Sequence, residues 1–121
     1  MSFREQIERI VNEVPGCVSC TLMGFDGIAV DTVDRSETVD GVNISDATIE
    51  YANLVRQMRT AAEGLASGAI EEVCVRSEKL STVLRPINEE YLVAASFSSD
   101  GLLGKGRYLL RVIAPRLGEE L

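Results

Sequence analysis

Two cysteines near the N-terminus have the spacing of a redox dithiol or of half a zinc site. Cys17 and Cys20 form a C-x-x-C pair within the segment PGCVSCTLMG. A redox pair normally sits at the N-terminus of a helix, where the helix dipole lowers the thiol pKa, but here a helical pattern ends just before Cys17. On a strand, side chains three positions apart point to opposite faces, so this pair could not hold one metal ion or close a disulfide. We therefore predict that these two residues and Cys74, the remaining cysteine, are small buried or half-buried apolar side chains.

The sequence also argues against other kinds of catalytic site and metal site. The chain contains no histidine, which excludes Ser-His-Asp and Cys-His catalysis and every histidine-ligated metal site. The segment GLLGKGR resembles a phosphate-binding loop, but Ser99 replaces the first glycine of the P-loop pattern and Gly106 replaces its hydroxyl residue. The acidic residues between 26 and 46 lack EF-hand spacing. We predict a protein that is not an enzyme, with no cofactor, metal or catalytic residue; the alternative is an enzyme or metal protein that uses the cysteines.

Length, composition and charge narrow the class of protein. The chain has 121 residues, 45% of them hydrophobic, which fits one domain over residues 1–121 with a real core. Its formal net charge of −7 argues against nucleic-acid binding, which needs clustered Lys and Arg. No apolar run reaches about 18 residues, so we expect no membrane insertion, and the charged N-terminal segment does not resemble a signal peptide. We therefore expect a cytoplasmic protein with reduced thiols.

Hydrophobic periodicity, together with glycine and proline positions, predicts the order of the elements. Ser2 and Glu5 form a capping-box pattern before a first helix, which ends at Pro15. A β-hairpin follows, then an acidic loop, a long helix, a three-stranded meander and a last helix. The predicted ranges are helix 3–14, strands 17–24 and 28–33, loop 34–46, helix 47–67, strands 70–77, 81–88 and 91–98, and helix 100–121.

Five features indicate how the meander and the last helix are built. The continuously apolar run 92–95 favours a central strand covered on both faces, whereas the alternating segment 71–77 suits a sheet edge that could pair with a second copy of the chain. Pro86 cannot donate a ladder hydrogen bond, so we expect a bulge or a strand end there. Asp100 is the expected N-cap of the last helix, and Pro115 is expected to kink or shorten that helix.

The predicted long helix, capped by Ser45 or Asp46 and ended by Gly68, has one apolar and one polar face. The apolar face is expected to pack on the core, although its small residues and the neighbouring edge strand would also suit a two-fold dimer. The apolar positions are Tyr51, Val55, Met58, Ala62 and Leu65, widened by Leu54, Ala61 and Ala66. The polar positions are Asn53, Arg56, Arg59, Thr60 and Glu63, bordered by Glu50 and Gln57.

The element order, the hairpin segment FDGIAV and the meander STVLRPINEEYLVAASFSSD followed by GLLGKGRYLLRVIAP resemble the roadblock/dynein light chain family, in particular its bacterial MglB-like members. The resemblance implies an α/β (α+β) fold in the order α-β-β-α-β-β-β-α, roadblock/profilin-like, with an antiparallel five-stranded sheet of order 2-1-5-4-3 and helices on both faces. It also implies a homodimer joined through the third strands and the middle helices. The implied dimer residues are Arg59, Ala62, Leu65, Ala66, Glu72, Val73, Cys74, Val75 and Arg76.

The resemblance further implies a non-enzymatic regulator or scaffold that binds a Ras-like small GTPase and stimulates its GTP hydrolysis. Arg56 and Arg59 could suggest an arginine finger, but exposed arginines near a helix pair are the more common explanation. The alternative function is a dimeric structural scaffold for a motor or signalling complex without GTPase contact. The expected GTPase-binding residues, on the polar face of the long helix, are Glu50, Asn53, Arg56, Gln57, Thr60 and Glu63.

Overall fold

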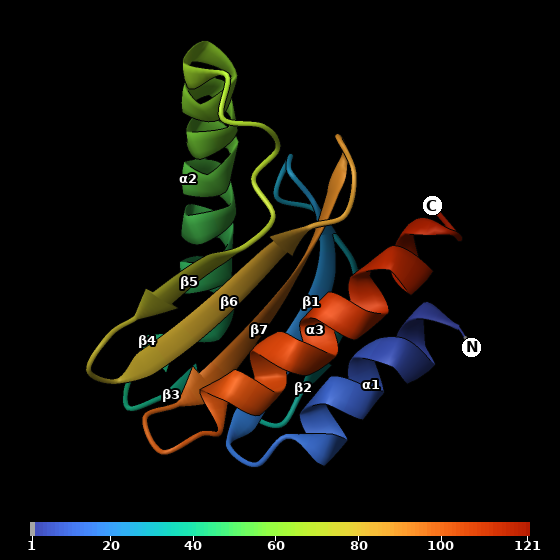
Figure 1. Cartoon of the computed structure of the whole chain (residues 1–121). Helices are drawn as coiled ribbons and strands as arrows, with labels where there is room; N and C mark the ends of the chain where they lie inside the picture. Colours follow the sequence, from blue (N-terminus) through green and yellow to red (C-terminus); the bar gives the residue numbers. More distant parts are fainter. Residues whose placement is uncertain (1) are drawn as a thin grey trace.

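A five-stranded sheet lies between two layers of helices in the computed structural model, which describes residues 2–121 (Figure 1). Helices α1 and α3 pack side by side on one face, and α2 lies alone on the other and extends beyond the sheet. The elements are α1 (Phe3–Glu13), β1 (Cys17–Gly24), β2 (Ala29–Asp34), β3 (Thr38–Val39), β4 (Val42–Asn43), α2 (Ile44–Leu65), β5 (Val73–Arg76), β6 (Leu80–Pro86), β7 (Tyr91–Ser98) and α3 (Leu103–Gly118).

The sheet confirms the predicted fold class. Its strand order is β2-β1-β7-β6-β5, all neighbours are antiparallel, and β7 is central as its apolar run predicted. The numbering differs from 2-1-5-4-3 in one detail, because two short strands, β3 and β4, form a separate hairpin where we predicted an irregular loop. The turn between them is Asp40-Gly41, and both residues have positive φ, 49° and 84°, as a two-residue hairpin turn requires.

The larger part of the core lies on the α1–α3 side of the sheet. The predicted capping box of α1 is confirmed, because the Glu5 backbone N–H donates to Ser2 Oγ at 3.2 Å and the Glu5 carboxylate accepts from the Ser2 backbone. The buried members of this cluster are Ile7, Ile10, Val11, Val14, Cys17, Cys20, Leu22, Val83, Val93, Ala95, Phe97, Leu109, Leu110, Ile113, Ala114 and Leu117. A smaller cluster lies under α2 and comprises Met23, Phe25, Ala52, Val55, Leu84, Leu92 and Ala94.

A β-bulge in β1 overturns the prediction that Cys17 and Cys20 face opposite sides of the sheet. Cys17 pairs with Phe97 and Ser19 pairs with Ser96, so the extra residue Val18 shifts the alternation by one position. Both thiols therefore join the α1–α3 core. Desolvation in this core raises the pKa of Cys17 to about 12 and the pKa of Cys20 well above its usual value. The prediction of a buried or half-buried side chain is wrong for Cys74, because this residue lies on the edge strand β5 and is exposed.

The boundaries of α2 and α3 differ from those predicted. Helix α2 begins at Ile44, three positions early, because Asn43 Oδ1 accepts from the backbone N–H of Asp46 at 2.9 Å and replaces the predicted caps Ser45 and Asp46. It ends at Leu65, followed by Ala66 in the left-handed conformation.

Helix α3 has Leu102 rather than Asp100 at its N-cap, with no side-chain cap, and continues through Pro115 to Gly118. The predicted strand end at Pro86 is confirmed, since Pro86 is the last residue of β6.

Two glycines near the start of α3 allow a matched test of how closely this helix packs on the sheet. An added Cβ at Gly106 would lie 2.3 Å from Cζ of the fully buried Phe97, whereas one at Gly104 would meet nothing within 4 Å. We expect Gly106→Ala to lower the free energy of unfolding by about 1–3 kcal/mol through overpacking. We expect Gly104→Ala to raise it by up to about 1 kcal/mol, because alanine is the better helix former. Denaturant titration measures both, and equal effects would contradict the close α3–β7 contact.

The cysteine environments predict unequal thiol reactivity. Because only the thiolate attacks an aromatic disulfide reagent, the raised pKa values and burial of Cys17 and Cys20 should make them at least about 100-fold slower than exposed Cys74. Mildly alkaline solution should therefore show one fast thiol in the folded protein and three after unfolding. Cys74→Ser is the control that should remove the fast phase. Fast reaction of two or three thiols in the folded protein would contradict the buried position of the C-x-x-C pair.

Candidate functional site

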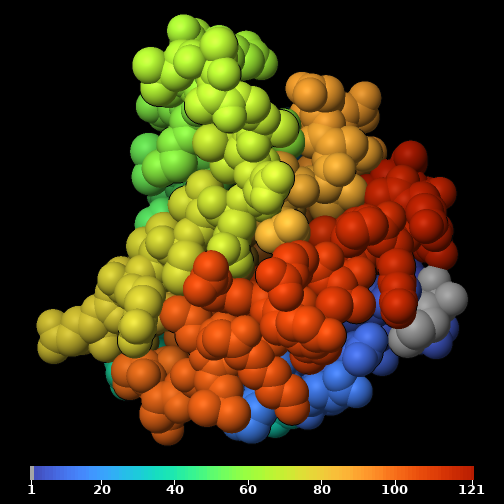
Figure 2. All heavy atoms as spheres, viewed as in Figure 1, coloured from blue at the N-terminus to red at the C-terminus, as the bar shows by residue number. Residues whose placement is uncertain are grey.

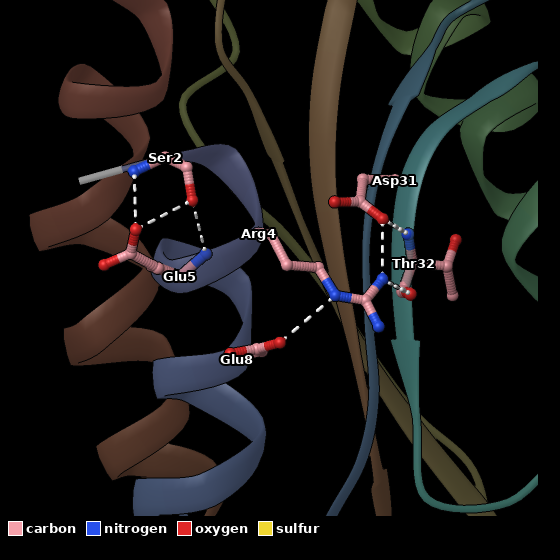
Figure 3. A network of polar contacts seen from close by, with 6 residues as sticks. All are labelled: Ser2, Arg4, Glu5, Glu8, Asp31 and Thr32. Carbon is pink, nitrogen blue, oxygen red and sulfur yellow. Dashed lines mark hydrogen bonds and ion pairs between the residues drawn. The ribbon is translucent and has the colours of Figure 1, made fainter.

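The two edges of the sheet differ in how open they are to another strand. At the β2 edge, Arg4 of α1 donates from Nη1 to the backbone carbonyl of Thr32 at 2.8 Å and pairs with Asp31 at 2.7 Å (Figure 3). Glu8 accepts from Arg4 Nε at 3.1 Å, and the hydrogen bonds to Asp31 and then Glu8 raise the Arg4 pKa. A guanidinium group placed on an edge strand hinders the approach of a second strand. The β2 edge is therefore protected.

The opposite edge, β5, carries no such protection within residues 2–121. Strand β5 pairs with β6 on one side and has no strand on the other in this part of the chain, so its outer N–H and C=O groups are available. Val73 and Val75 pack toward α2, while Cys74 and Arg76 are exposed. The predicted edge role of residues 71–77 is confirmed for the part that forms β5.

Helix α2 has an exposed apolar stripe next to this open edge. Leu54, Met58, Ala61 and Leu65 are four, three and four positions apart and so share one side of the helix. The exposed fractions of Leu54, Met58 and Leu65 are 45%, 43% and 78%. Tyr51, one turn before Leu54 on the same side, packs in the cluster that includes Val73 and Val75 of β5. The apolar stripe and the open edge therefore lie on the same side of the molecule, beside β5 (Figure 1).

The structure separates the predicted dimer residues into accessible and occupied positions. Leu65, Ala66, Cys74 and Arg76 are exposed, and Glu72, Val73 and Val75 are half-buried, whereas Ala62 is only 6% exposed within its own chain. Arg59 also makes contacts within the chain. Its Nη2 donates to the carbonyl of Asn88 at 2.7 Å, its guanidinium carbon lies 3.9 Å from the centroid of the Phe25 ring, and desolvation lowers its pKa.

Leu54, Met58 and Ala61 are exposed positions that sequence reasoning placed in the core-facing face. The signal that could have revealed them is the width of the apolar face, because eight apolar positions are more than a single helix can bury on one side of a small sheet.

Apart from Arg59, which is half-buried over the Phe25 ring, the predicted polar face of α2 is one exposed surface. Its only side-chain contacts within residues 2–121 are local: Arg56 Nη2 donates to Asn53 Oδ1 at 2.8 Å, and the Thr60 hydroxyl donates to the carbonyl of Arg56 at 3.4 Å. Glu50 and Gln57 border the apolar stripe on the helix surface. The exposed set is Glu50, Asn53, Arg56, Gln57, Thr60 and Glu63, all of the predicted GTPase-binding residues.

A cavity of about 420 Å³ lies between the first half of α2 and strands β1 and β2. Its lining contains hydroxyl groups, with Ser19 donating to Asp34 at 2.5 Å and Thr21 hydrogen-bonded to Thr32. It has no cysteine, lysine or histidine to act as nucleophile or base, and no group of three potential metal ligands occurs within residues 2–121. The hydroxyls of Ser19 and Thr21 are thus each paired with a neighbouring side chain, and Asp34 and Glu37 are the carboxylates of the lining.

None of the helices within residues 2–121 combines the length and the apolar composition needed to cross a bilayer.

Solved structures resemble this chain over its whole length. MglC from Myxococcus xanthus is 47% identical, with 100% of both chains covered and a TM-score of 0.70. MglB, a gliding protein from Thermus thermophilus, is 16% identical and matches 98% of this chain and 89% of its own with a TM-score of 0.80. A Roadblock/LC7 domain from Streptomyces avermitilis is 13% identical and matches 99% and 98% of the two chains with a TM-score of 0.79.

No protein-family model and no curated protein matched the sequence. The two remote structures share the fold, and the 47% identity to MglC over both full chains shows the family. The chain belongs to the roadblock/LC7 family, with MglC as a relative that is 47% identical over both full chains.

Proposed function

We propose that this protein is a non-enzymatic homodimeric regulator that binds a Ras-like small GTPase and stimulates its GTP hydrolysis. The observation that carries the proposal is the arrangement on α2, where an exposed apolar stripe beside an open strand edge borders a fully exposed polar face. The first surface suits a second copy of the chain, and the second remains available for a partner. Membership of a family whose members typically act as GTPase-binding scaffolds supports the choice of partner.

The dimer would be isologous, with β5 pairing with β5 and α2 packing on α2. Pairing of the open edges would satisfy the outer N–H and C=O groups of β5 and extend the sheet to ten strands. The same two-fold axis would bring the stripe of Leu54, Met58, Ala61 and Leu65 against its own copy. Each buried Leu or Met side chain contributes about 1.5–3 kcal/mol, and every contact occurs twice.

The polar faces of both α2 helices would then lie on one side of the dimer, available to a GTPase. This chain has no histidine, and the carboxylates on that face, Glu50 and Glu63, are exposed to solvent. The effect on hydrolysis would therefore come from holding the switch loops of the GTPase in their active arrangement. Arg56 would contribute charge to this surface, since its guanidinium is exposed and paired only with the neutral Asn53.

Charged substitutions in the apolar stripe test the dimer. We expect Leu65→Glu and Met58→Glu to weaken self-association by about 100-fold or more, because each removes two buried contacts per dimer and introduces two carboxylates. Sedimentation equilibrium measures the dissociation constant. Leu102→Glu is the matched control, because Leu102 is 52% exposed at the start of α3 on the other face of the sheet.

Ala62→Glu is unsuitable for this test, because Ala62 is buried within its own chain and the substitution would unfold it. A wild-type protein that is fully monomeric at micromolar concentration would refute the proposed architecture. So would equal dissociation by Leu65→Glu and Leu102→Glu.

The proposed regulation of a GTPase is tested by measuring phosphate release from GTP-loaded Ras-like GTPases of the same cell. We expect wild-type protein to bind one of them and raise its hydrolysis rate, and Arg56→Gln to weaken binding by about 10-fold through loss of one interfacial charge. Arg111→Gln on α3 is the control and should leave binding within about two-fold. If no Ras-like GTPase binds or responds while the protein remains dimeric, the regulator proposal fails and the structural scaffold without GTPase contact takes its place.

A further inference from the structure

Helix α3 concentrates positive charge in an otherwise acidic chain. It contains Lys105, Arg107, Arg111 and Arg116, four of the twelve basic residues of the sequence, and none of the nineteen acidic ones. All four side chains are exposed. Figure 2, viewed from this side, shows the residues of α3 along the outer surface and in contact with the segment that leads into β5. The α3 face therefore differs in charge from the remainder of the molecule.

A groove of about 320 Å³ runs between α3, the residues that lead into β5 and the end of β6. It is lined by Arg85, Arg107, Tyr108 and Arg111, with Glu71 and Glu72 at one end and Gly104 opening the wall of α3. An added Cβ at Gly104 would meet nothing within 4 Å, so the space beside the helix is accessible. The volume is at the lower end of the range for ligand sites, large enough for one or two carboxylate side chains.

Of the three arginines that line the groove, one is paired with a carboxylate and two are not. Glu72 accepts two hydrogen bonds from Arg107, at 3.0 Å from Nε and 2.7 Å from Nη2, and this bidentate pair fixes the Arg107 side chain. The hydrogen bonding by Arg107 is the main cause of the lowered pKa of Glu72, to which the nearby charges of Arg85 and Arg111 also contribute. Arg85 and Arg111 form no ion pair within residues 2–121. The guanidinium groups of Arg85 and Arg111 are therefore available to pair with carboxylates of another molecule.

The orientation of Arg111 suits a planar acidic group. Its guanidinium carbon lies 5.6 Å from the centroid of the Tyr108 ring, a contact that supports the side chain while its donors remain in solvent. Guanidinium groups bind carboxylates through two parallel hydrogen bonds, which ammonium groups cannot do. Lys105 and Arg116 extend the positive charge along the same helix on either side.

We propose that the α3–β6 groove binds an acidic segment of a partner protein, with carboxylates of that segment paired to Arg85 and Arg111. The charge distribution favours a short peptide over a membrane or a nucleic acid. The acidic residues lie outside α3 and give the chain a net charge of −7, so an extended polyanionic surface would be repelled beyond the groove. A peptide segment can lie in the groove without approaching the other faces.

This inference does not depend on the proposed GTPase regulation. The groove lies on the α3 side of the sheet, while the polar face of α2 lies on the opposite side (Figure 1). Variants at the two sites therefore serve as controls for one another, and failure of one proposal leaves the other intact.

Fluorescence anisotropy with a fluorescein-labelled peptide of four consecutive glutamates tests the groove in the wild-type protein at low salt. We expect saturable binding that Arg85→Gln and Arg111→Gln each weaken by about 5- to 10-fold, the effect of losing one charge-assisted pair. Arg56→Gln on α2 removes the same charge and should change binding by less than about two-fold. Arg111→Lys keeps the charge but loses the planar fork, so we expect a loss smaller than that of Arg111→Gln.

Three results would overturn the proposal. The first is the absence of saturable binding by the glutamate peptide, or equal binding of a tetraglutamine peptide. The second is an equal loss in Arg56→Gln and Arg111→Gln, which would indicate general attraction to net charge. The third is stronger, Arg111-dependent binding to vesicles containing phosphatidylglycerol, which would assign the groove to a membrane surface. Unfolding curves of each variant confirm that the fold is retained.

Discussion

A single helix covers one face of a five-stranded sheet, and the exposed apolar stripe and the cavity beside α2 follow from that imbalance. Five strands spaced about 4.8 Å apart span roughly 19 Å, whereas one helix with its side chains is about 10 Å wide. Helices α1 and α3 together match the width of the sheet and bury the larger cluster. Helix α2 can match only half of it, so part of its apolar surface stays exposed beside β5.

The sequence accommodates the undercovered face in two different ways. Toward β1 and β2, apolar side chains give way to hydroxyls, and Ser19, Thr21 and Thr48 line a cavity in which polar groups bond to one another. Toward β5, the side chains stay apolar and exposed on α2, and the strand edge stays open. Hydroxyl groups can hydrogen-bond to water, so the side toward β1 and β2 is stable in contact with solvent. On the side toward β5, a second copy of the chain would cover the apolar side chains and pair with the open strand edge. The difference between the two edges agrees with this interpretation, since only the β2 edge carries Arg4 across it.

Features set by local sequence were predictable, and those set by long-range pairing were not. The capping box at Ser2, the central position of β7 and the strand end at Pro86 each depend on residue types within a few positions, and all three are confirmed. The bulge at Val18 arises only when β1 pairs with β7, eighty residues later in the chain, and no residue type in PGCVSC predicts it. That single extra residue reverses the expected orientation of Cys17.

The candidate site shows the same division. The polar face of α2 was recognisable because six polar residues recur at helical spacing, and all six are exposed. The extent of the exposed apolar stripe could not be predicted, because periodicity identifies the apolar side of a helix but not how much of that side the sheet can cover. The groove on α3 was missed for a related reason. Its three arginines come from β6 and α3, separated by more than twenty positions, and only the packing of that helix beside β5 brings them around Glu72.

The two proposed binding surfaces, the polar face of α2 and the groove beside α3, lie on opposite faces of the sheet. A segment bound along α3 contacts side chains anchored on the larger cluster, while a partner on α2 contacts a helix that packs on the smaller one. No side-chain hydrogen bond within residues 2–121 joins α2 to α3, so occupation of one surface does not oppose occupation of the other. Under both proposals one dimer would present a paired α2 surface on one side and two cationic grooves on the other. Such an arrangement would bring a GTPase and an acidic partner segment together, and its effect would come from their relative position.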